Sequence, residues 1–185
     1  MTDLFLRQYS SPTVYLFEPI PSLAKDLRNK YSGMNNIFVH EKALGAKTET
    51  VRFNVVRNEV SSSVLTPSNI SRGYHGSKMD TVEMIDVEQV RLDEILNEEI
   101  DILKLDLQGY ELEALKGCGG VLGKTKSITT EIEFVPLYED QVVFGELDMF
   151  LRESGFQLLN LYELWTHPDG QLTAGDAVYL NMRYF

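Results

Sequence analysis

The fold is decided by the stretch Asp101-Ile102-Leu103-Lys104-Leu105-Asp106-Leu107-Gln108-Gly109-Tyr110-Glu111. Its first apolar residues predict a buried strand, and Asp106 lies near the carboxyl end of that strand. Gly109 permits a sharp turn, and residues 111–116 predict a helix that ends at Gly117. A strand, a turn and a helix in this order are typical of an α/β protein.

Short apolar runs alternate with amphipathic segments on both sides of that stretch. Further strands are expected at residues 14–17, 37–39, 49–55, 82–92, 127–134, 156–165 and 176–184, and further helices at 2–9, 21–31, from 93 and around 147–151. The run 14–17 is continuously apolar, which predicts a strand buried on both faces. Val51, Phe53 and Val55 alternate with polar neighbours, which predicts an antiparallel strand with one wet face.

The last two expected strands are joined by a turn that contains Asp169 and Gly170. No helix is expected between them, so these two strands must be antiparallel neighbours. A purely parallel dinucleotide-binding fold would place a crossover helix there. The sequence therefore predicts an α/β fold with a mostly parallel sheet and an antiparallel C-terminal hairpin, which is the Rossmann-like architecture of class I methyltransferases.

Length and composition favour a single soluble domain over residues 1–185. Hydrophobic residues make up 43% and charged residues 24%, proportions that exclude a wholly disordered chain. The net charge of −11 repels phosphate backbones, and no basic patch argues for nucleic-acid binding. No apolar stretch is long enough to span a bilayer, and Asp3 stands where a signal peptide needs a basic residue. The single cysteine, Cys118, indicates a reducing compartment, so we expect a cytoplasmic protein.

Residues 57–80 are polar and rich in serine and glycine. A loop of that length is uncommon inside a compact domain unless it serves as a lid or a binding segment. We therefore expect a substrate loop at 57–80. His75 within it is a candidate general base, because the ordinary pKa of histidine lies near neutrality. A solvated loop histidine is the alternative.

Glu18 directly follows the expected strand 14–17. An acid at the carboxyl end of an early parallel strand can accept two hydrogen bonds from a ribose diol. The alternative is a structural carboxylate near the start of the next helix, where the helix dipole favours it. The residue alone does not decide between these interpretations, and the first indicates a nucleoside without indicating a reaction.

Three further acids are candidates for chemistry. Asp106 lies in the crevice beyond the strand ends, where it could orient the substrate, contact a cofactor or accept a hydroxyl proton. A hydrogen bond to the turn at Gln108-Gly109 is its structural alternative. Glu131 and Glu133 lie two apart on a strand and so share a face, and because unpaired glutamates are costly to bury, we expect them to line a cavity or the wet end of the sheet. A paired-carboxylate hydrolase stays open, since the sequence does not fix the separation that such chemistry requires.

No metal site is predicted. His40, His75 and His167 are scattered, and none stands in a metal-ligand or triad spacing with Cys118. The acids match no calcium-loop pattern, and the sequence contains no phosphate-binding loop of the Walker type.

Several segments together resemble the FkbM-type methyltransferase family. The matching segments are Val14-Tyr15-Leu16-Phe17-Glu18-Pro19, the Ala43-Leu44-Gly45 turn, Leu92-Asp93-Glu94-Ile95-Leu96, residues 102–111 with Leu115-Lys116-Gly117, residues 131–141 and Gly175-Asp176-Ala177. They occur in the family's order over nearly the whole chain, and the segment from Lys104 to Gly117 is the specific one.

The resemblance implies methyl transfer from S-adenosylmethionine, typically to a hydroxyl oxygen. It places Glu18 on the cofactor ribose, the segment around Ala43 and Leu44 on adenine, and Asp106 beside the methyl donor or the acceptor oxygen. The catalytic candidates are Asp106, Glu131 and His75, and the substrate-binding candidates are Ser62, Ser63, Glu133 and Tyr138. The expected acceptor is a small molecule or sugar with a hydroxyl group. No nucleic acid or membrane is expected as a partner, and the sequence leaves a homo-oligomer open.

The sequence departs from the family pattern at its start. The family begins with a strand that ends in a glycine-rich turn, whose backbone approaches the methionine part of the cofactor, whereas no glycine here precedes Gly33. We therefore expect an N-terminally truncated sequence without the central first strand, whose neighbours would keep unpaired backbone groups. One alternative is a non-catalytic remnant that has lost cofactor binding and whose strand edge another chain fills. A nicotinamide-dependent oxidoreductase is the third, although its fingerprint is missing and the terminal hairpin opposes its topology.

Overall fold

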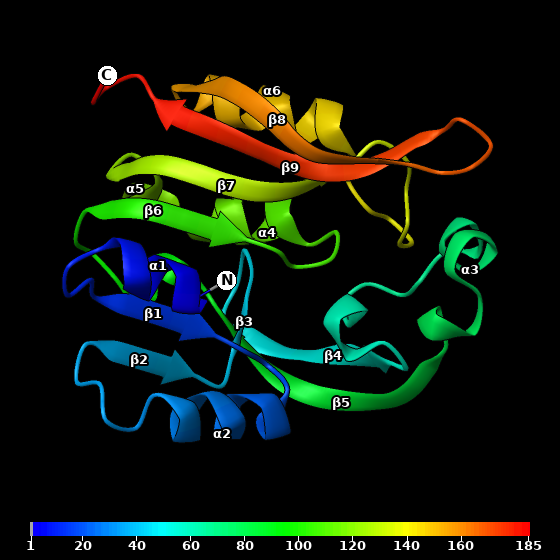
Figure 1. Ribbon diagram of the computed structural model, residues 1–185, viewed down its shortest axis with the longest axis horizontal. Helices are drawn as coiled ribbons and strands as arrows, with labels where there is room; N and C mark the ends of the chain where they lie inside the picture. Colours follow the sequence, from blue (N-terminus) through cyan, green and yellow to red (C-terminus); the bar gives the residue numbers. More distant parts are fainter. Residues whose placement is uncertain (1) are drawn as a thin grey trace.

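The computed structural model describes residues 2–185 and has a mixed α/β architecture (Figure 1). Its strands are β1 (Val14–Phe17), β2 (Ile37–His40), β3 (Ala43–Leu44), β4 (Glu49–Val56), β5 (Thr81–Val90), β6 (Ile100–Leu105), β7 (Thr125–Glu133), β8 (Phe156–Thr166) and β9 (Leu172–Asn181). Its α-helices are α1 (Thr2–Gln8), α2 (Pro21–Lys30), α3 (Asn69–His75), α4 (Glu111–Gly117), α5 (Gly119–Leu122) and α6 (Phe144–Glu153).

The strands of residues 2–185 form three hydrogen-bonded sheets, with the orders β1-β2, β3-β5-β4 and β6-β7-β9-β8. The prediction of one mostly parallel sheet is wrong, because the strands divide into three sheets. The pairs β1–β2, β3–β5 and β6–β7 are parallel, whereas β4–β5, β7–β9 and β8–β9 are antiparallel. Within the described residues β1 pairs only with β2 and β6 only with β7, so no ladder joins the first sheet to the third. The predicted C-terminal hairpin is confirmed, since β8 and β9 pair in antiparallel register.

The first sheet is covered by α2. This helix begins at Pro21, whose fixed φ suits the first helical position, and Ile20 before it makes no side-chain cap. Ala24, a residue of α2, is fully buried. The four residues of β1 are only half-buried, which corrects the prediction of a strand buried on both faces. A strand with one pairing partner keeps an open edge, and through that edge its side chains stay partly accessible.

The second sheet confirms one strand prediction and corrects another. β4 is antiparallel to β5, as the alternating pattern predicted, but the expected wet face is wrong for the second half of the strand, where residues 53–56 are all buried. Ala43 and Leu44 form the short strand β3, which pairs in parallel with Gln89 and Val90 of β5, so the expected turn at this position is wrong. Two residues are too short a segment for periodicity to reveal, and a partner more than forty residues away supplies the pairing.

The segment 57–80 contains more regular structure than the expected loop. It holds 3₁₀ helices at Glu59–Ser61 and Gly76–Met79 on either side of α3. Ser68 caps α3 by accepting a hydrogen bond from the backbone N–H of Ser71 at 3.2 Å. Figure 1 shows α3 beyond the ends of β4 and β5, toward the tip of the β8–β9 hairpin.

The third sheet carries the largest core. Helices α4, α5 and α6 lie on one of its faces (Figure 1) and bury Leu115 and Leu151 completely. The predicted strand, turn and helix around Asp106 are confirmed, because β6 ends at Leu105 and α4 ends at Gly117. A methyl group on Gly117 would lie 2.0 Å from the carbonyl oxygen of Gly45, so α4 packs directly on the backbone that follows β3.

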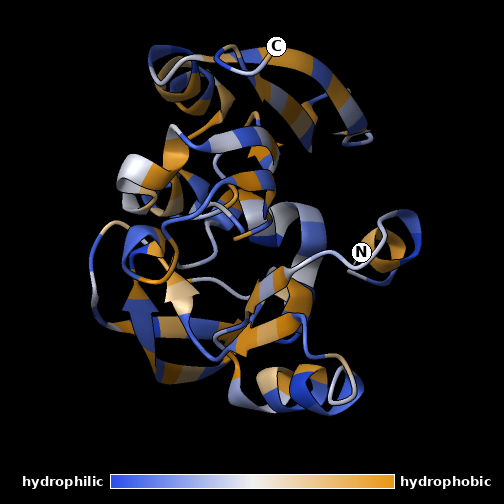
Figure 2. Cartoon of the chain, turned by 90° about the vertical axis from the view of Figure 1, so that its left-hand side faces the viewer, coloured by the Kyte–Doolittle hydropathy of each residue, from blue (hydrophilic) through white to orange (hydrophobic). Residues whose placement is uncertain are grey.

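Figure 2 shows apolar residues concentrated along the strands and on the inner sides of the helices, with α1 standing apart from the sheets. No residue of α1 is buried. Asp3 ties this helix to the end of α2 by accepting hydrogen bonds from Lys30 at 2.6 Å and from Tyr31 at 2.8 Å. None of the helices formed by residues 2–185 combines the length and the apolar character needed to cross a membrane.

Candidate functional site

The structure brings Asp106 and Glu131 together at the carboxyl ends of β6 and β7. Asp106 directly follows β6, and Glu131 lies near the end of the parallel neighbour β7. The side-chain amide of Gln108 joins them, because its Nε2 donates to Asp106 Oδ1 at 3.0 Å and to Glu131 Oε2 at 2.6 Å. Two of the three predicted catalytic residues therefore form one cluster.

The acids of this cluster differ in exposure. The Asp106 side chain is 53% exposed, whereas Glu133 is 3% exposed and Glu111 is 2% exposed. Glu111 begins α4 and accepts a hydrogen bond from the backbone N–H of Leu107 at 2.6 Å, which fixes the turn between β6 and α4. The cluster thus combines one accessible carboxylate, that of Asp106, with three more deeply placed acids, Glu111, Glu131 and Glu133. We call these three acids the acidic floor.

Burial raises the pKa of each acid in this floor. Burial is the main cause for Glu131, followed by the charges of Asp106 and Glu111, and Lys104 opposes them, so that the pKa lies at about 8. Burial raises the pKa of Glu111 and the hydrogen bond from the backbone N–H of Leu107 lowers it, so that the pKa lies at about 7. The pKa of Glu133 is raised well above its ordinary value, by burial and then by Glu111 and Glu131. The floor therefore holds protons near neutral pH.

Tyr138 and Ser63 lie at the same cluster, and both were predicted on the substrate side. The Tyr138 hydroxyl lies 2.8 Å from the carbonyl oxygen of Ser61 and 3.0 Å from Gln108 Oε1, and can donate to either. Ser63 Oγ donates to the carbonyl oxygen of Gln108 at 2.9 Å. Ser62 Oγ accepts from the backbone N–H of Val56 at 3.1 Å. These contacts fasten the segment 61–63 to the turn after β6.

Glu18 takes up the position expected at the carboxyl end of β1. Its Oε1 accepts a hydrogen bond from the backbone N–H of Ile20 at 2.8 Å, which places the carboxylate at the start of α2. Burial raises the pKa of Glu18. The structure thus supports the helix-start interpretation, and the ribose role stays a prediction. Ala43 and Leu44 are both 6% exposed in β3, and their contact with adenine also stays a prediction.

His75 lies in a different cluster. Its ring stacks on Trp165 of β8 at 5.2 Å, while Tyr74 stacks on His167 at 4.0 Å, so α3 is joined to the hairpin tip. Burial lowers the pKa of His75, and the charges of Lys78 and His167 lower it further. The contacts of the described residues do not connect His75 with Asp106 or Glu131, and its role as a base stays a prediction.

Three functional candidates were missed from the sequence. Gln108 was quoted in the decisive stretch without a role, although a polar residue directly before Gly109 is a usable signal for a turn-mounted side chain. Lys104 contacts Asp176 at 2.8 Å and Asp106 at 3.8 Å. Gln141 is 9% exposed, its Oε1 accepts from the backbone N–H of Tyr138 at 3.0 Å, and its side chain lies beside Glu133, whose pKa a hydrogen bond from Gln141 lowers.

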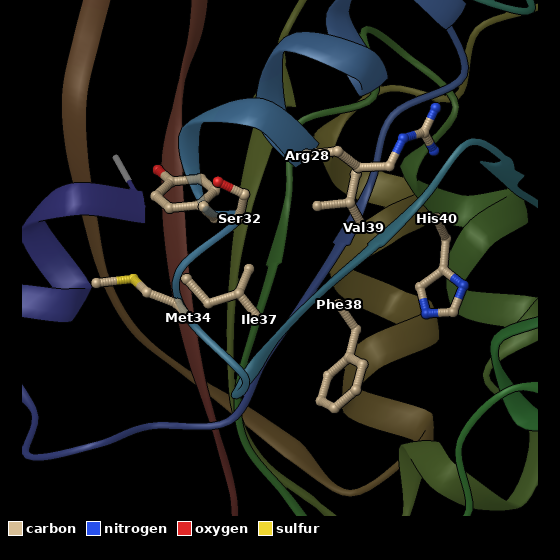
Figure 3. Close-up of a pocket in the computed structure, with 8 residues that line it drawn as sticks. Arg28, Ser32, Met34, Ile37, Phe38, Val39 and His40 are labelled. Carbon is tan, nitrogen blue, oxygen red and sulfur yellow. The ribbon is translucent and has the colours of Figure 1, made fainter.

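The acids do not form a metal site in residues 2–185, since no three histidine, cysteine or acidic side chains there converge as ligands. A surface hollow of about 330 Å³ lies instead beside α2 and β2, and Arg28, Phe38 and His40 are among its lining residues (Figure 3). It contains none of the predicted site residues. Carboxylates and carboxylic acids at the strand ends can attract a cation, accept protons from hydroxyls and donate a proton of their own.

Comparisons with known proteins show what the chain as a whole is similar to. Residues 2–158 match the family model described as the Methyltransferase FkbM domain. The 2-O-methyltransferase NoeI of Sinorhizobium fredii (strain NBRC 101917 / NGR234) is 28% identical over 149 residues, which cover 75% of this chain and 60% of that protein. The crystal structure of the methyltransferase FkbM from Methylobacillus flagellatus KT superposes with a TM-score of 0.58 at 18% identity, over 97% of this chain and 39% of that chain. This chain thus spans less than two thirds of each relative's length.

Proposed function

This chain belongs to the FkbM methyltransferase family, and on that premise we propose that it transfers a methyl group from S-adenosylmethionine to a hydroxyl oxygen of a small acceptor. The observation that carries the proposal is the joining of Asp106 and Glu131 by Gln108 at the carboxyl ends of two parallel strands. Open α/β proteins bind their ligands at this edge of the sheet. A carboxylate placed there can take the proton that an attacking hydroxyl loses.

The chemistry needs alignment more than activation. When bound, S-adenosylmethionine supplies a methyl group on an already activated sulfonium. The chain's own task is to hold the acceptor oxygen in line with that methyl carbon and to receive the acceptor proton. Asp106 is the accessible carboxylate for that proton. Glu131, with a pKa raised by burial to about 8, can share it.

The polar groups present fit such a donor. A sulfonium is a cation, and the acids at the strand ends complement its charge. Glu18 keeps Oε2 free of hydrogen bonds from residues 2–185, so this oxygen can accept from a ribose hydroxyl. Ala43 and Leu44 offer the apolar surroundings that an adenine ring requires, although their strand would have to expose one face to it.

The acceptor side of the proposed site lies toward Glu133, Tyr138 and the segment with Ser62 and Ser63. Tyr138 and Ser63 already connect this segment to Gln108. We propose a sugar or another small molecule with a hydroxyl group as the acceptor. The relative from Sinorhizobium is named as a 2-O-methyltransferase, which supports oxygen as the methylated atom. His75 is proposed as a base only if α3 moves toward Asp106.

The finer features of the fold belong to the same proposal. The strand orders β2-β1 and β6-β7-β9-β8 are compatible with a Rossmann-like class I methyltransferase in which one more strand lies between β1 and β6. We propose that residues 1–185 act as one domain in the cytoplasm, with 57–80 as the substrate segment. The acidic net charge of −11 supports a small-molecule partner over a nucleic acid.

The test combines binding with turnover. Isothermal titration calorimetry of the 185-residue chain with S-adenosylhomocysteine should give binding heat with a dissociation constant in the micromolar range. Transfer of tritiated methyl groups to a panel of monosaccharides and phenols should reveal an acceptor. Asp106→Asn should lower turnover about 100-fold or more. Asp101→Asn, which changes an exposed acid at the other end of β6, is the matched control. Absence of both heat and transfer in the folded chain would contradict the proposal, as would equal turnover in the two variants.

A non-catalytic binding protein is the second candidate, and one observation favours it. Among residues 2–185, β1 and β6 each pair along one edge only. An open strand edge accepts an extended segment of another chain. A folded chain that gives no heat with S-adenosylhomocysteine, and yet sediments as a complex with a strand-forming peptide, would favour this candidate over the enzyme.

A further inference from the structure

Gln108 occupies an unusual backbone conformation directly beside the acids. Its φ is +55°, in the left-handed region, and Gly109 follows at +90°. Glycine adopts this region freely, but a glutamine does so only where the surrounding structure compels it. Strained residues of this kind cluster at functional sites, where the strain positions a side chain.

Neighbouring contacts hold this turn from both sides. Glu111 Oε1 accepts from the backbone N–H of Leu107 at 2.6 Å, and Ser63 Oγ donates to the carbonyl oxygen of Gln108 at 2.9 Å. A methyl group on Gly109 would approach the Gln141 side chain to 2.9 Å, so the turn also packs closely on the segment that follows β7. The backbone of Gln108 is therefore fixed independently of its own side chain.

The side-chain amide of Gln108 then contacts three separate elements. Nε2 donates to Asp106 and Glu131, and Oε1 accepts from Tyr138 at 3.0 Å. These partners fix the orientation of the amide, because the reversed amide would set its oxygen against two carboxyl groups. Among the described residues, this amide donates to both Asp106 and Glu131, and a hydrogen bond between the two carboxyl groups adds to the raised pKa of Glu131.

A neutral amide suits this position better than a charged group. A lysine here would hold both acids ionised, and a glutamate would add a further negative charge to the floor. The amide donates to both acids and leaves each free to gain or lose a proton. Tyr138 extends the link, since its hydroxyl can donate either to Gln108 Oε1 or to the carbonyl oxygen of Ser61 in the substrate segment.

We propose that Gln108 is a positioning residue that holds Asp106 and Glu131 side by side for proton transfer and couples this acid pair, through Tyr138, to the segment 61–63. The role of Gln108 in catalysis rests on the proposed function. The hydrogen-bond coupling of Asp106 to Glu131 does not depend on that function, because it involves only groups of this chain. Binding of an acceptor against residues 61–63 would move the Tyr138 hydroxyl and thereby change the hydrogen bonds that Gln108 offers to the acids.

The test uses Gln108→Leu and Gln108→Asn in the full 185-residue chain. Leucine removes the three side-chain contacts. Asparagine favours the left-handed backbone and keeps an amide, but its shorter side chain cannot span both acids. The readout is the pH titration of the Glu131 carboxyl carbon by NMR in ¹³C-glutamate-labelled protein, assigned with Glu131→Gln. Far-ultraviolet circular dichroism confirms that each variant is folded.

Loss of the Nε2 donor should raise the pKa of Glu131 by about 1 unit in Gln108→Leu, because a hydrogen bond to the charged form has been removed, and by less in Gln108→Asn, whose amide can still reach one of the acids. If methyl transfer is measurable, kcat should fall at least about 10-fold and its pH profile should shift in the same direction, with KM for the methyl donor unchanged. A Glu131 titration that is identical in wild type, Gln108→Leu and Gln108→Asn would overturn the inference. Absence of both S-adenosylhomocysteine binding and methyl transfer in wild type would instead refute the proposed function, and the NMR titration would still decide the role of Gln108.

Discussion

Lys104 Nζ lies 2.8 Å from Asp176 Oδ1, and this ion pair joins β6 to β9 across the intervening strand β7. Asp176 is paired in register with Glu131, so the positive charge of Lys104 lies beside Glu131 on the same face of the sheet. Lys104 is 18% exposed in its side chain, which limits the screening of its charge by water. The positive charge of Lys104 thereby lowers the pKa of Glu131.

Replacement of this lysine should change both acidity and stability. Lys104 lowers the pKa of Glu131, so Lys104→Met should raise that pKa above about 8 in a ¹³C NMR titration. The variant should lose about 1–3 kcal/mol of unfolding free energy in urea, because Asp176 is left without its partner. Lys126→Met is the control, since Lys126 pairs with the exposed Asp101 and should cost under about 1 kcal/mol. An unchanged Glu131 titration in folded Lys104→Met would contradict this account.

The acidic floor predicts an unusual pH dependence of stability. Glu111 and Glu131 have pKa values of about 7 and 8 in the folded chain, above their unfolded values, so the folded state holds more protons. Their stabilising contribution is complete at acid pH below the unfolded pKa, and it is lost as the pH rises through 7 and 8. The free energy of unfolding, measured by urea denaturation, should therefore fall between pH 5.5 and 8.5, by up to about 1.4 kcal/mol per pH unit for each group.

Glu131→Gln supplies the check on that dependence. The variant cannot ionise at this position, so its stability should fall less steeply with pH than that of wild type. Glu146→Gln, on the exposed side of α6, should follow the wild-type curve. A slope that is the same in Glu131→Gln and wild type would mean that the carboxyl group of Glu131 does not titrate in this range.

The parts of this fold that the sequence predicts are local. The strand before Asp106, the turn at Gly109 and helix α4 follow from residues within one short stretch, and the β8–β9 hairpin follows from the lack of a helix between two apolar runs. The contacts that form the site are not local. Ser63 reaches Gln108 across 45 residues, Tyr138 reaches Ser61 across 77, and no periodic pattern carries such information.

The same limit explains the errors. Ala43 and Leu44 become a strand only because β5 arrives beside them, and the division into three sheets depends on which edges find partners. Glu131 and Glu133 were recognisable as costly to bury, yet the sequence could not say that Gln108 would donate to Glu131 or that Gln141 would lower the pKa of Glu133. Helix and strand propensities likewise do not predict where the side chain of Gln108 lies, because its backbone is in the left-handed region.

Helix α4 should tolerate no side chain at Gly117. A Cβ at this position would lie 2.0 Å from the carbonyl oxygen of Gly45, and neither backbone can give way without moving β3 or α4. Gly117→Ala should therefore lower the free energy of unfolding by about 1–3 kcal/mol or more, measured by urea denaturation. Gly120→Ala is the matched control, because no atom lies within 4 Å of its added methyl group, and it should be neutral or slightly stabilising. Equal losses in both variants would show that α4 does not pack against Gly45.

The stacking of His75 on Trp165 should make the chain's one tryptophan a reporter of the contact between α3 and the hairpin. A protonated imidazole quenches indole fluorescence, and burial with the charges of Lys78 and His167 lowers the pKa of His75 below its ordinary 6.5. Tryptophan emission should therefore rise with pH through a midpoint below 6.5, and His75→Gln should abolish this transition. His167→Gln should shift the midpoint upward because it removes a neighbouring positive charge, whereas His40→Gln, which removes a ring stacked on Phe17, should leave the curve unchanged. A transition that persists in His75→Gln would contradict the assignment of the quenching to His75, since the His167 ring also lies near Trp165, at 6.5 Å between ring centroids.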